Sequence, residues 1–208
     1  MALVMPRLYA IIDRAHVADR SLASVAGILV QAGITLIQYR DKQATSRDLY
    51  DRCRELTGVI RHRSATLIVN DRADVALATD ADGVHLGQDD LPVELARRVL
   101  KPGRFIGCSA HNLEQVIAAK ESSADYIAFG PVFATTSKEA AGPVVGLDGL
   151  RQARTATRKP LVAIGGITVE RARAAIDAGA DGVAVIGGLL DAEDLEAQAR
   201  EFLAALAV

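Results

Sequence analysis

Eight short aliphatic runs, separated by segments of helical period, constrain the fold of this chain more than any other feature. They are Leu8–Ile12, Leu36–Arg40, Thr66–Asn70, Val84–Gly87, Phe105–Ala110, Tyr126–Gly130, Leu161–Gly165 and Val183–Gly187. Each run is too short for a buried helix, and nearly continuous apolar runs are typical of parallel strands covered on both faces. Between two of them, Leu49, Cys53, Leu56 and Ile60 recur at helical spacing, which predicts an amphipathic helix.

Strict alternation of strands and helices predicts a parallel sheet with right-handed crossovers. Eight strands in this order close most naturally into a TIM (β/α)8 barrel, an α/β fold. A doubly wound open sheet is the alternative, and the alternation by itself allows both. No Gly-, Ser- or Pro-rich linker and no step in composition divides the chain, so we expect a single domain over residues 1–208.

The charge balance limits the partners of this chain. Its 24 basic and 26 acidic residues give a net charge of −2, which provides no broad positive field for nucleic acid or an anionic membrane. No apolar run of about 18 residues and no secretion signal is present. The two cysteines, Cys53 and Cys108, fall in segments of regular structure, which favours a reduced, cytoplasmic protein. We therefore expect small-molecule substrates, while a homo-oligomer stays open.

Polar residues follow nearly every predicted strand, at the end where TIM barrels keep their active sites. These segments are Gln38–Lys42, Asn70–Arg72, His85–Asp90, Gly107–His111, Gly130–Lys138 and Gly165–Thr168. Taken singly, each residue has an ordinary structural explanation, such as a helix cap for Asp71 or Asp90. Those explanations do not account for the convergence of cations, carboxylates, an amide and hydroxyls on one rim. The pattern therefore predicts one polar site at the mouth of the barrel.

The residue types on this rim suit the departure of a diphosphate. Magnesium takes one or two carboxylates together with substrate phosphates, and Asp71 and Asp90 supply two carboxylates from neighbouring strands. Arg40 can bind phosphate bidentately, while Lys42 and Lys138 add point charges. No Ser/His/Asp or Cys/His nucleophile set is evident, so the sequence does not indicate covalent catalysis.

A second phosphate site is expected after the seventh and eighth strands. Barrels often bind phosphate there through backbone N–H groups, and Gly165-Gly166 and Gly187-Gly188 fall at these two places. One Gly-Gly pair is equally consistent with a tight turn. Two pairs at the expected positions favour a phosphate site.

Taken in order, these motifs resemble those of the thiamine phosphate synthase family over nearly the whole chain. The family's Gln-x-Arg-[Asp/Glu]-Lys, Asn-Asp, His-x-Gly-Gln-x-Asp and Gly-x-Ser-x-His are similar to Gln38–Lys42, Asn70-Asp71, His85–Asp90 and Gly107–His111. The most specific motif, Gly-Pro-[Val/Ile]-[Phe/Tyr]-x-Thr-x-[Thr/Ser]-Lys, is matched by Gly130–Lys138. Three positions depart from the common pattern: Tyr39 stands where many relatives have Leu, Ala134 replaces a frequent Pro, and Gly187 replaces a frequent Ser.

The resemblance implies an enzyme that joins a hydroxymethylpyrimidine diphosphate to a hydroxyethylthiazole phosphate, with magnesium held by Asp71 and Asp90. The substrate-binding candidates it implies are Gln38, Tyr39, Arg40, Asp41, Lys42, Asn70, Ser109, Thr135, Thr136, Ser137, Lys138, Gly166, Ile186 and Gly187. Alternation along the strand nevertheless points Tyr39 away from the mouth. The catalytic candidates are Arg40, Lys42, Ser109 and Lys138. The implied reaction is dissociative: diphosphate leaves first, and the thiazole nitrogen then attacks the pyrimidine methylene cation.

Two alternatives share the expected fold. A thiazole tautomerase resembles the synthases but lacks the diphosphate and magnesium set, and it uses a histidine at the position of His111. This chain keeps the whole set, which favours the synthase. A non-catalytic sensor of a phosphorylated ligand would have no need of paired carboxylates.

Overall fold

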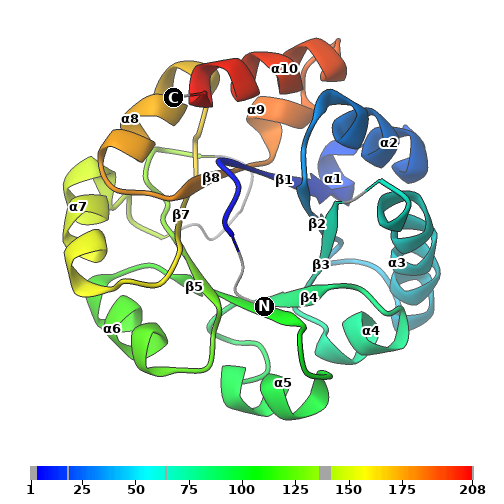
Figure 1. Cartoon of the computed structure of the whole chain (residues 1–208), viewed down its shortest axis with the longest axis horizontal. Coiled ribbons are helices and arrows are strands. Elements are labelled where there is room, and N and C mark those ends of the chain that lie inside the picture. Colours follow the sequence, from blue (N-terminus) through cyan, green and yellow to red (C-terminus); the bar gives the residue numbers. More distant parts are fainter. Residues whose placement is uncertain (1–3, 18, 64, 136–141, 208) are drawn as a thin grey trace.

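Eight parallel strands form a closed barrel surrounded by helices (Figure 1). The computed structural model describes residues 4–17, 19–63, 65–135 and 142–207. The strands are β1 Leu8–Asp13, β2 Leu36–Arg40, β3 Thr66–Asn70, β4 Gly83–Leu86, β5 Phe105–Ala110, β6 Tyr126–Phe129, β7 Leu161–Ile164 and β8 Gly182–Val185. Each strand pairs in parallel with the next in sequence, and β1 pairs with β8. The closed barrel is therefore confirmed over the open sheet.

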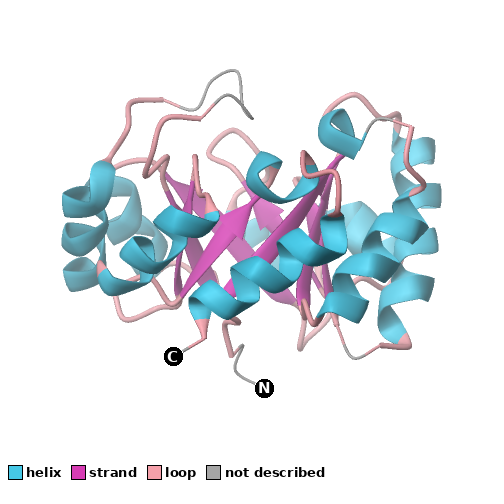
Figure 2. Cartoon of the chain, turned by 90° about the horizontal axis from the view of Figure 1, so that it is seen from above, coloured by secondary structure: helices cyan, strands magenta, loops and turns pink. Residues whose placement is uncertain are grey.

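The helices lie outside the barrel and cover the strands (Figures 1 and 2). They are α1 Arg14–Val17, α2 Leu22–Ala32, α3 Ser46–Arg61, α4 Ala73–Ala78, α5 Val93–Val99, α6 Leu113–Glu121, α7 Gly146–Ala156, α8 Val169–Asp177, α9 Gly187–Leu190 and α10 Leu195–Leu206. Local sequence explains several ends. Ser21 caps α2 by accepting a hydrogen bond from Ser24 N, and Gly33 ends it in the left-handed conformation.

The predicted strands agree with the observed ones to within two residues at each end. The runs over β6, β7 and β8 were predicted to include Gly130, Gly165 and Gly187, but each strand ends before its glycine. These glycines begin the loops or the next helix. The predicted run over β1 was one residue too short, because Asp13 still pairs with Arg40 of β2.

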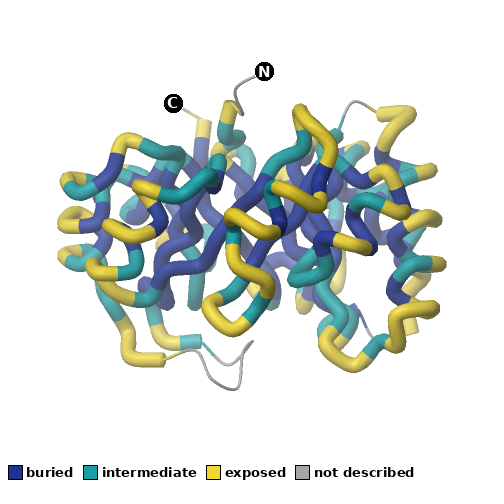
Figure 3. The backbone as a smooth tube through the Cα atoms, turned by 90° about the horizontal axis from the view of Figure 1, so that it is seen from below, coloured by how far each residue is buried: buried dark blue, intermediate teal, exposed yellow. Residues whose placement is uncertain are grey.

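The core lies inside the barrel and between the barrel and its helices, as the buried central tube in Figure 3 shows. The predicted helical face of α3 is confirmed, since Leu49, Cys53, Leu56 and Ile60 are all buried. Cys53 and Cys108 are both free thiols. Among the described residues, none of the helices has the length and apolar character needed to traverse a bilayer.

Candidate active site

Arg40 is anchored at the barrel mouth by an aspartate that the sequence analysis did not single out. Its guanidinium forms an ion pair with the carboxylate of Asp13, whose side chain is 2% exposed. Asp13 also accepts a hydrogen bond from Ala15 N at 3.0 Å, which fixes the carboxylate at the end of β1. The available signal was positional, because Asp13 follows its aliphatic run in the same way as the other polar residues follow theirs.

Lys42, Asp71 and Asp90 meet on the neighbouring part of the rim, after β2, β3 and β4. The Lys42 ammonium is ion-paired with the Asp71 carboxylate. Burial and a hydrogen bond with Asp90 raise the pKa of Asp71, while Lys42 opposes this shift. The backbone helps to hold this arrangement: Asp71 N donates to His85 O at 2.7 Å, and Asp90 accepts from Gly87 N at 2.6 Å.

The pair of carboxylates fits a divalent cation. Two acidic groups close enough to raise the pKa of one of them repel each other when both are ionised, and a cation between them removes that cost. Within the described part of the chain, no group of three or more His, Cys, Asp or Glu residues could hold a metal. A site with two carboxylates leaves further coordination positions to water and to phosphate oxygens, which is the pattern typical of magnesium.

Two candidates from the first motif have their side chains on the outer side of β2. The Tyr39 hydroxyl donates to Asp41 Oδ2 at 3.1 Å, and Asp41 is ion-paired with Arg52 of α3. Tyr39 is completely buried, as expected from strand alternation. The structure thus does not bring these two side chains to the group around Arg40 and Lys42. Their contacts support the β2–α3 connection.

Ser109 lies inside the barrel near the end of β5, and its hydroxyl is 3.0 Å from His85 Nε2. The other ring nitrogen of His85 is 3.1 Å from the Tyr126 hydroxyl, which is 2.9 Å from the Tyr9 hydroxyl. Gln38 Nε2 donates to the Tyr9 hydroxyl at 2.8 Å. A continuous buried chain of polar side chains therefore connects Gln38 on β2 with Ser109 on β5.

The loops after β6, β7 and β8 form the other side of the mouth. Gly166 has φ of 62°, and a Cβ there would lie 2.3 Å from Ala134 O, so the β6 and β7 loops touch at a position only glycine can occupy. A Cβ at Gly188 would lie 2.5 Å from Ile167 O, which places the start of α9 against the β7 loop. The two Gly-Gly pairs predicted from the sequence are therefore neighbours in space.

Three further candidates, Asn70, Thr135 and Ile186, follow or end strands at this mouth. Asn70 ends β3 and is half-buried, and Thr135 is half-buried in the loop after β6. Ile186 is 7% exposed and precedes Gly187, the first residue of α9. Thr136, Ser137 and Lys138 lie outside the described residues.

His111 is held by the β6 loop. Its Nδ1 is 2.8 Å from Gly130 O, and its backbone N donates to Gln115 Oε1 at 2.7 Å. The side chain is half-buried and joins the end of β5 to the start of the Gly130–Lys138 segment. This contact gives His111 a structural role.

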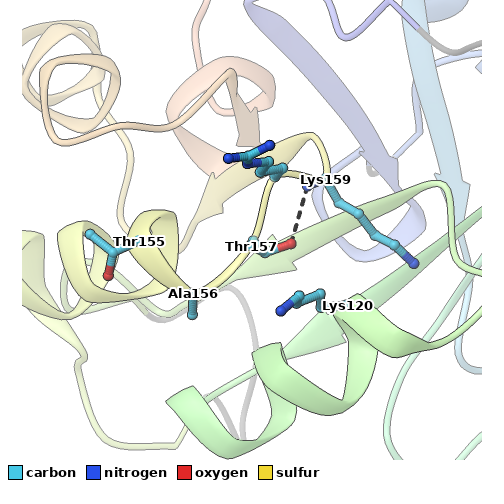
Figure 4. A pocket seen from close by; sticks show the side chains of 6 residues that line it. Lys120, Thr155, Ala156, Thr157 and Lys159 are labelled. Atoms are coloured by element: carbon cyan, nitrogen blue, oxygen red, sulfur yellow. Dashed lines mark hydrogen bonds between the residues drawn. The ribbon is translucent and has the colours of Figure 1, made fainter.

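A basic hollow at the opposite end of the barrel is separate from the mouth. It is lined by Lys120 and the segment from Thr155 to Lys159, just before β7 begins (Figure 4). The Lys159 ammonium donates to Ala119 O at 3.0 Å and to Ser122 O at 2.5 Å. Its backbone N donates to Thr157 Oγ1 at 3.1 Å. Lys159 therefore ties the end of α6 to the segment that leads into β7.

Barrel and mouth together define a class of protein. The cations, the paired carboxylates and the glycine loops all lie at the carboxyl ends of the strands, and that is where TIM-barrel enzymes carry out their chemistry. The chain is a TIM-barrel enzyme.

Comparison with known proteins identifies the particular family. The thiamine monophosphate synthase family matches residues 8–189. A thiamine-phosphate synthase of Koribacter versatilis is 51% identical and covers 97% of this chain and 96% of the relative. One from Chloroflexus aurantiacus is 46% identical over 97% of this chain and 93% of the relative. The solved thiamine phosphate pyrophosphorylase of Pyrococcus furiosus is 37% identical, with a TM-score of 0.87 and coverage of 96% and 95%. This chain belongs to the thiamine monophosphate synthase family.

Membership confirms the resemblance seen in the motifs and makes the chain a transferase of thiamine biosynthesis. Both sequence relatives and the solved structure carry the synthase or pyrophosphorylase name. The thiazole tautomerase alternative finds no support among them.

Proposed function

We propose that the barrel mouth joins hydroxymethylpyrimidine diphosphate to hydroxyethylthiazole phosphate, giving thiamine phosphate and diphosphate. The observation that carries this proposal is the division of the mouth into two regions. Arg40, Lys42 and the paired carboxylates Asp71 and Asp90 cluster after β2 to β4. The crowded glycine loops lie after β6 to β8. Two separate phosphate-binding regions suit a reaction of two phosphorylated substrates.

The first region would bind the diphosphate. Arg40, oriented by Asp13, would hold phosphate oxygens, while Lys42 would neutralise charge on the leaving group. Asn70 and Lys138 complete this set by resemblance to the family. Asp71 and Asp90 would hold magnesium, which supplies positive charge to the departing diphosphate when bound.

The second region would bind the thiazole phosphate through backbone N–H groups. Gly166 and Gly187 let a phosphate approach the chain closely, and Ile186 brings its backbone to the same place. By the same resemblance, the hydroxyls of Thr135, Thr136 and Ser137 would add hydrogen bonds. Ser109 would meet the pyrimidine between the two regions.

The chemistry needs little from the protein beyond placement and charge. Once diphosphate departs, the electron-rich aminopyrimidine stabilises its methylene cation, and the thiazole nitrogen attacks it. The mouth supplies cations for the leaving group and holds the two rings together, which can lower a barrier substantially. Such a reaction requires no protein nucleophile, in agreement with the residue types present.

The test is incubation of the purified protein with both substrates and magnesium, followed by mass spectrometry of the products. We expect equal amounts of thiamine phosphate and diphosphate, and no product when either substrate or magnesium is omitted. Diphosphate released at the same rate without the thiazole phosphate would identify a hydrolase instead. Absence of any product under all conditions would favour the non-catalytic sensor.

We also propose that one domain makes up the whole chain and that it acts in a reducing compartment such as the cytoplasm. The two free, buried thiols support this compartment, since no disulfide stabilises the fold. Limited proteolysis tests the domain proposal: one domain gives a single resistant core spanning both ends of the sequence.

A further inference from the structure

The buried hydrogen bonds from Gln38 to Ser109 form a series in which the groups themselves limit which one donates and which one accepts. Gln38 Nε2 donates to the Tyr9 hydroxyl, and either hydroxyl could donate across the 2.9 Å between Tyr9 and Tyr126. If Tyr126 donated, the buried Tyr9 oxygen would accept twice and its own proton would have no acceptor among the described contacts, so donation from Tyr9 to Tyr126 is the favoured direction. Burial raises the pKa of Tyr9 and the pKa of Tyr126, so both phenols keep their protons. Each phenol therefore accepts one hydrogen bond and donates one onward.

The same logic determines the tautomer of His85. With that direction, Tyr126 accepts from Tyr9 and its proton points to His85 Nδ1, 3.1 Å away, which can accept it only when the ring is neutral. A neutral imidazole that accepts at Nδ1 carries its proton on Nε2. His85 Nε2 then donates to Ser109 Oγ across 3.0 Å, and the chain does not use the proton of Ser109 itself.

We infer that Tyr126 and His85 are positioning residues that fix Ser109 as a hydrogen-bond donor toward an acceptor nitrogen of the aminopyrimidine ring. Neither residue needs to touch the substrate for this role, because each acts through the next group in the chain. The inference rests on the proposed function, in which Ser109 meets the pyrimidine. It gives a role in that function to two buried side chains inside the barrel, Tyr126 and His85, which lie behind Ser109.

The barrel leaves room for this buried series of hydrogen-bonded side chains. A Cβ at position 107 would lie 2.1 Å from the Tyr126 ring and 2.5 Å from His85 Nδ1, so Gly107 leaves the space that the two side chains occupy. The rings pack closely, with centroids 5.9 Å apart for Tyr9 and Tyr126 and 5.5 Å apart for His85 and Tyr126. This packing restricts rotation of the rings and so preserves the hydrogen-bond order.

The first experiment reads the proton direction without any assay of activity. The chain has four histidines, and the ring nitrogens of His85 are assigned in ¹⁵N-labelled wild type by comparison with His85→Gln. We expect the Nε2–H tautomer, with Nδ1 unprotonated. The Nδ1–H tautomer would reverse the bonds that link Tyr9, Tyr126, His85 and Ser109 and would overturn the inference.

The second experiment is a double-mutant cycle on Tyr126 and Ser109. Tyr126→Phe keeps the ring and removes the hydroxyl that bonds with both Tyr9 and His85, so kcat/KM for the pyrimidine diphosphate should fall about three- to tenfold. The KM for the thiazole phosphate should not change. In the Ser109→Ala background the same substitution should cost less than about twofold, because its effect passes through Ser109.

Equal losses in the two backgrounds would show a purely structural role and overturn the inference. Tyr50→Phe is the matched control, since Tyr50 lies half-buried on the outer helix α3. The two proposals fail separately. A wild type that makes no thiamine phosphate refutes the proposed function, whereas an active wild type with the wrong His85 tautomer refutes only the positioning role.

Discussion

Asp13 and Arg40 are the last residues of two neighbouring strands, and the register of β1 and β2 places them opposite each other. In their ion pair the Asp13 side chain is almost completely buried, at 2% exposed, and the Arg40 side chain is 16% exposed. The closing of the barrel thus gives the guanidinium a fixed direction over the mouth. A group held in this way loses little conformational freedom when it binds a phosphate.

The first prediction tests this pair with Asp13→Asn, which keeps the shape and removes the charge. We expect kcat/KM for the pyrimidine diphosphate to fall about tenfold, because Arg40 loses its orientation. The free energy of unfolding should fall by about 1.5–3 kcal/mol, the usual range for a hydrogen bond to a charged group. The control is Asp51→Asn, which removes an exposed pair with Arg47 and should change stability by less than about 1 kcal/mol. Similar effects of the two variants would argue against a special role for Asp13.

A second prediction concerns the paired carboxylates. Asp71→Asn and Asp90→Asn should each lower turnover at least about a hundredfold at low magnesium, with partial recovery as magnesium is raised. Circular dichroism should show an intact fold for both. Asp74→Asn is the control. Asp74 lies on α4 and forms an exposed ion pair with Arg72, so this variant should keep wild-type activity. Wild-type activity of either test variant across the whole titration would show that its carboxylate is not a ligand.

Crowding at Gly166 gives a third prediction. Gly166→Ala should raise the KM for the thiazole phosphate about tenfold or more, because the new methyl group forces the β7 loop away from Ala134. Gly103→Ala is a close control: Gly103 also has positive φ, but a Cβ there would meet nothing within 4 Å. Both variants should lose about 1 kcal/mol of stability from backbone strain. An unchanged KM in Gly166→Ala would remove this loop from the thiazole site.

His111 provides the fourth prediction. Since its ring is bonded to Gly130 O, His111→Ala should disturb the loop after β6 and lower coupling by about tenfold at most. General acid–base catalysis would instead contribute about 10²–10⁴-fold. Coupling and thiazole isomerisation are measured side by side on wild type and variant. Isomerisation that depends on His111, without coupling in either protein, would contradict the synthase activity.

The fifth prediction uses the buried thiols. Burial raises the pKa of Cys53 to about 12 and the pKa of Cys108 to about 11, whereas both thiols titrate near their ordinary values in the unfolded chain. Above about pH 9 the unfolded state therefore releases protons that the folded state retains, so stability must fall as pH rises. In urea unfolding between about pH 9 and 11, wild type should lose stability more steeply than Cys53→Ala. If the free energies of unfolding of wild type and Cys53→Ala change with pH in parallel, the Cys53 thiol does not contribute to this loss of stability.

The strands and helices could be predicted because their signals are local. The runs over β2, β3 and β5 match the observed bounds, and the buried face of α3 follows directly from helical spacing. Strand ends at glycines could not be predicted to the residue, since an apolar run does not show where the chain leaves the sheet. At the end of β7, the chain leaves the sheet at Gly165, which has a φ of 97°.

Individual partners in the site were harder to foresee. The sequence placed Arg40, Lys42, Asp71 and Asp90 on one rim, but it gave no reason to connect Arg40 with Asp13. Likewise, Tyr39 and Asp41 belong to a motif of the family, yet their side chains contact α3. Such contacts depend on which face of the strand a residue occupies and on what packs against that face.

The sequence by itself determined the order of strands and helices, the polar character of the barrel mouth and the family, because each depends on residues near one another along the chain. Only the tertiary structure decided that Asp13 holds Arg40 and that five side chains from five different strands form one hydrogen-bonded series, namely Tyr9, Gln38, His85, Ser109 and Tyr126. The physical reason is barrel closure, which fixes register and brings residues far apart in sequence within hydrogen-bonding distance.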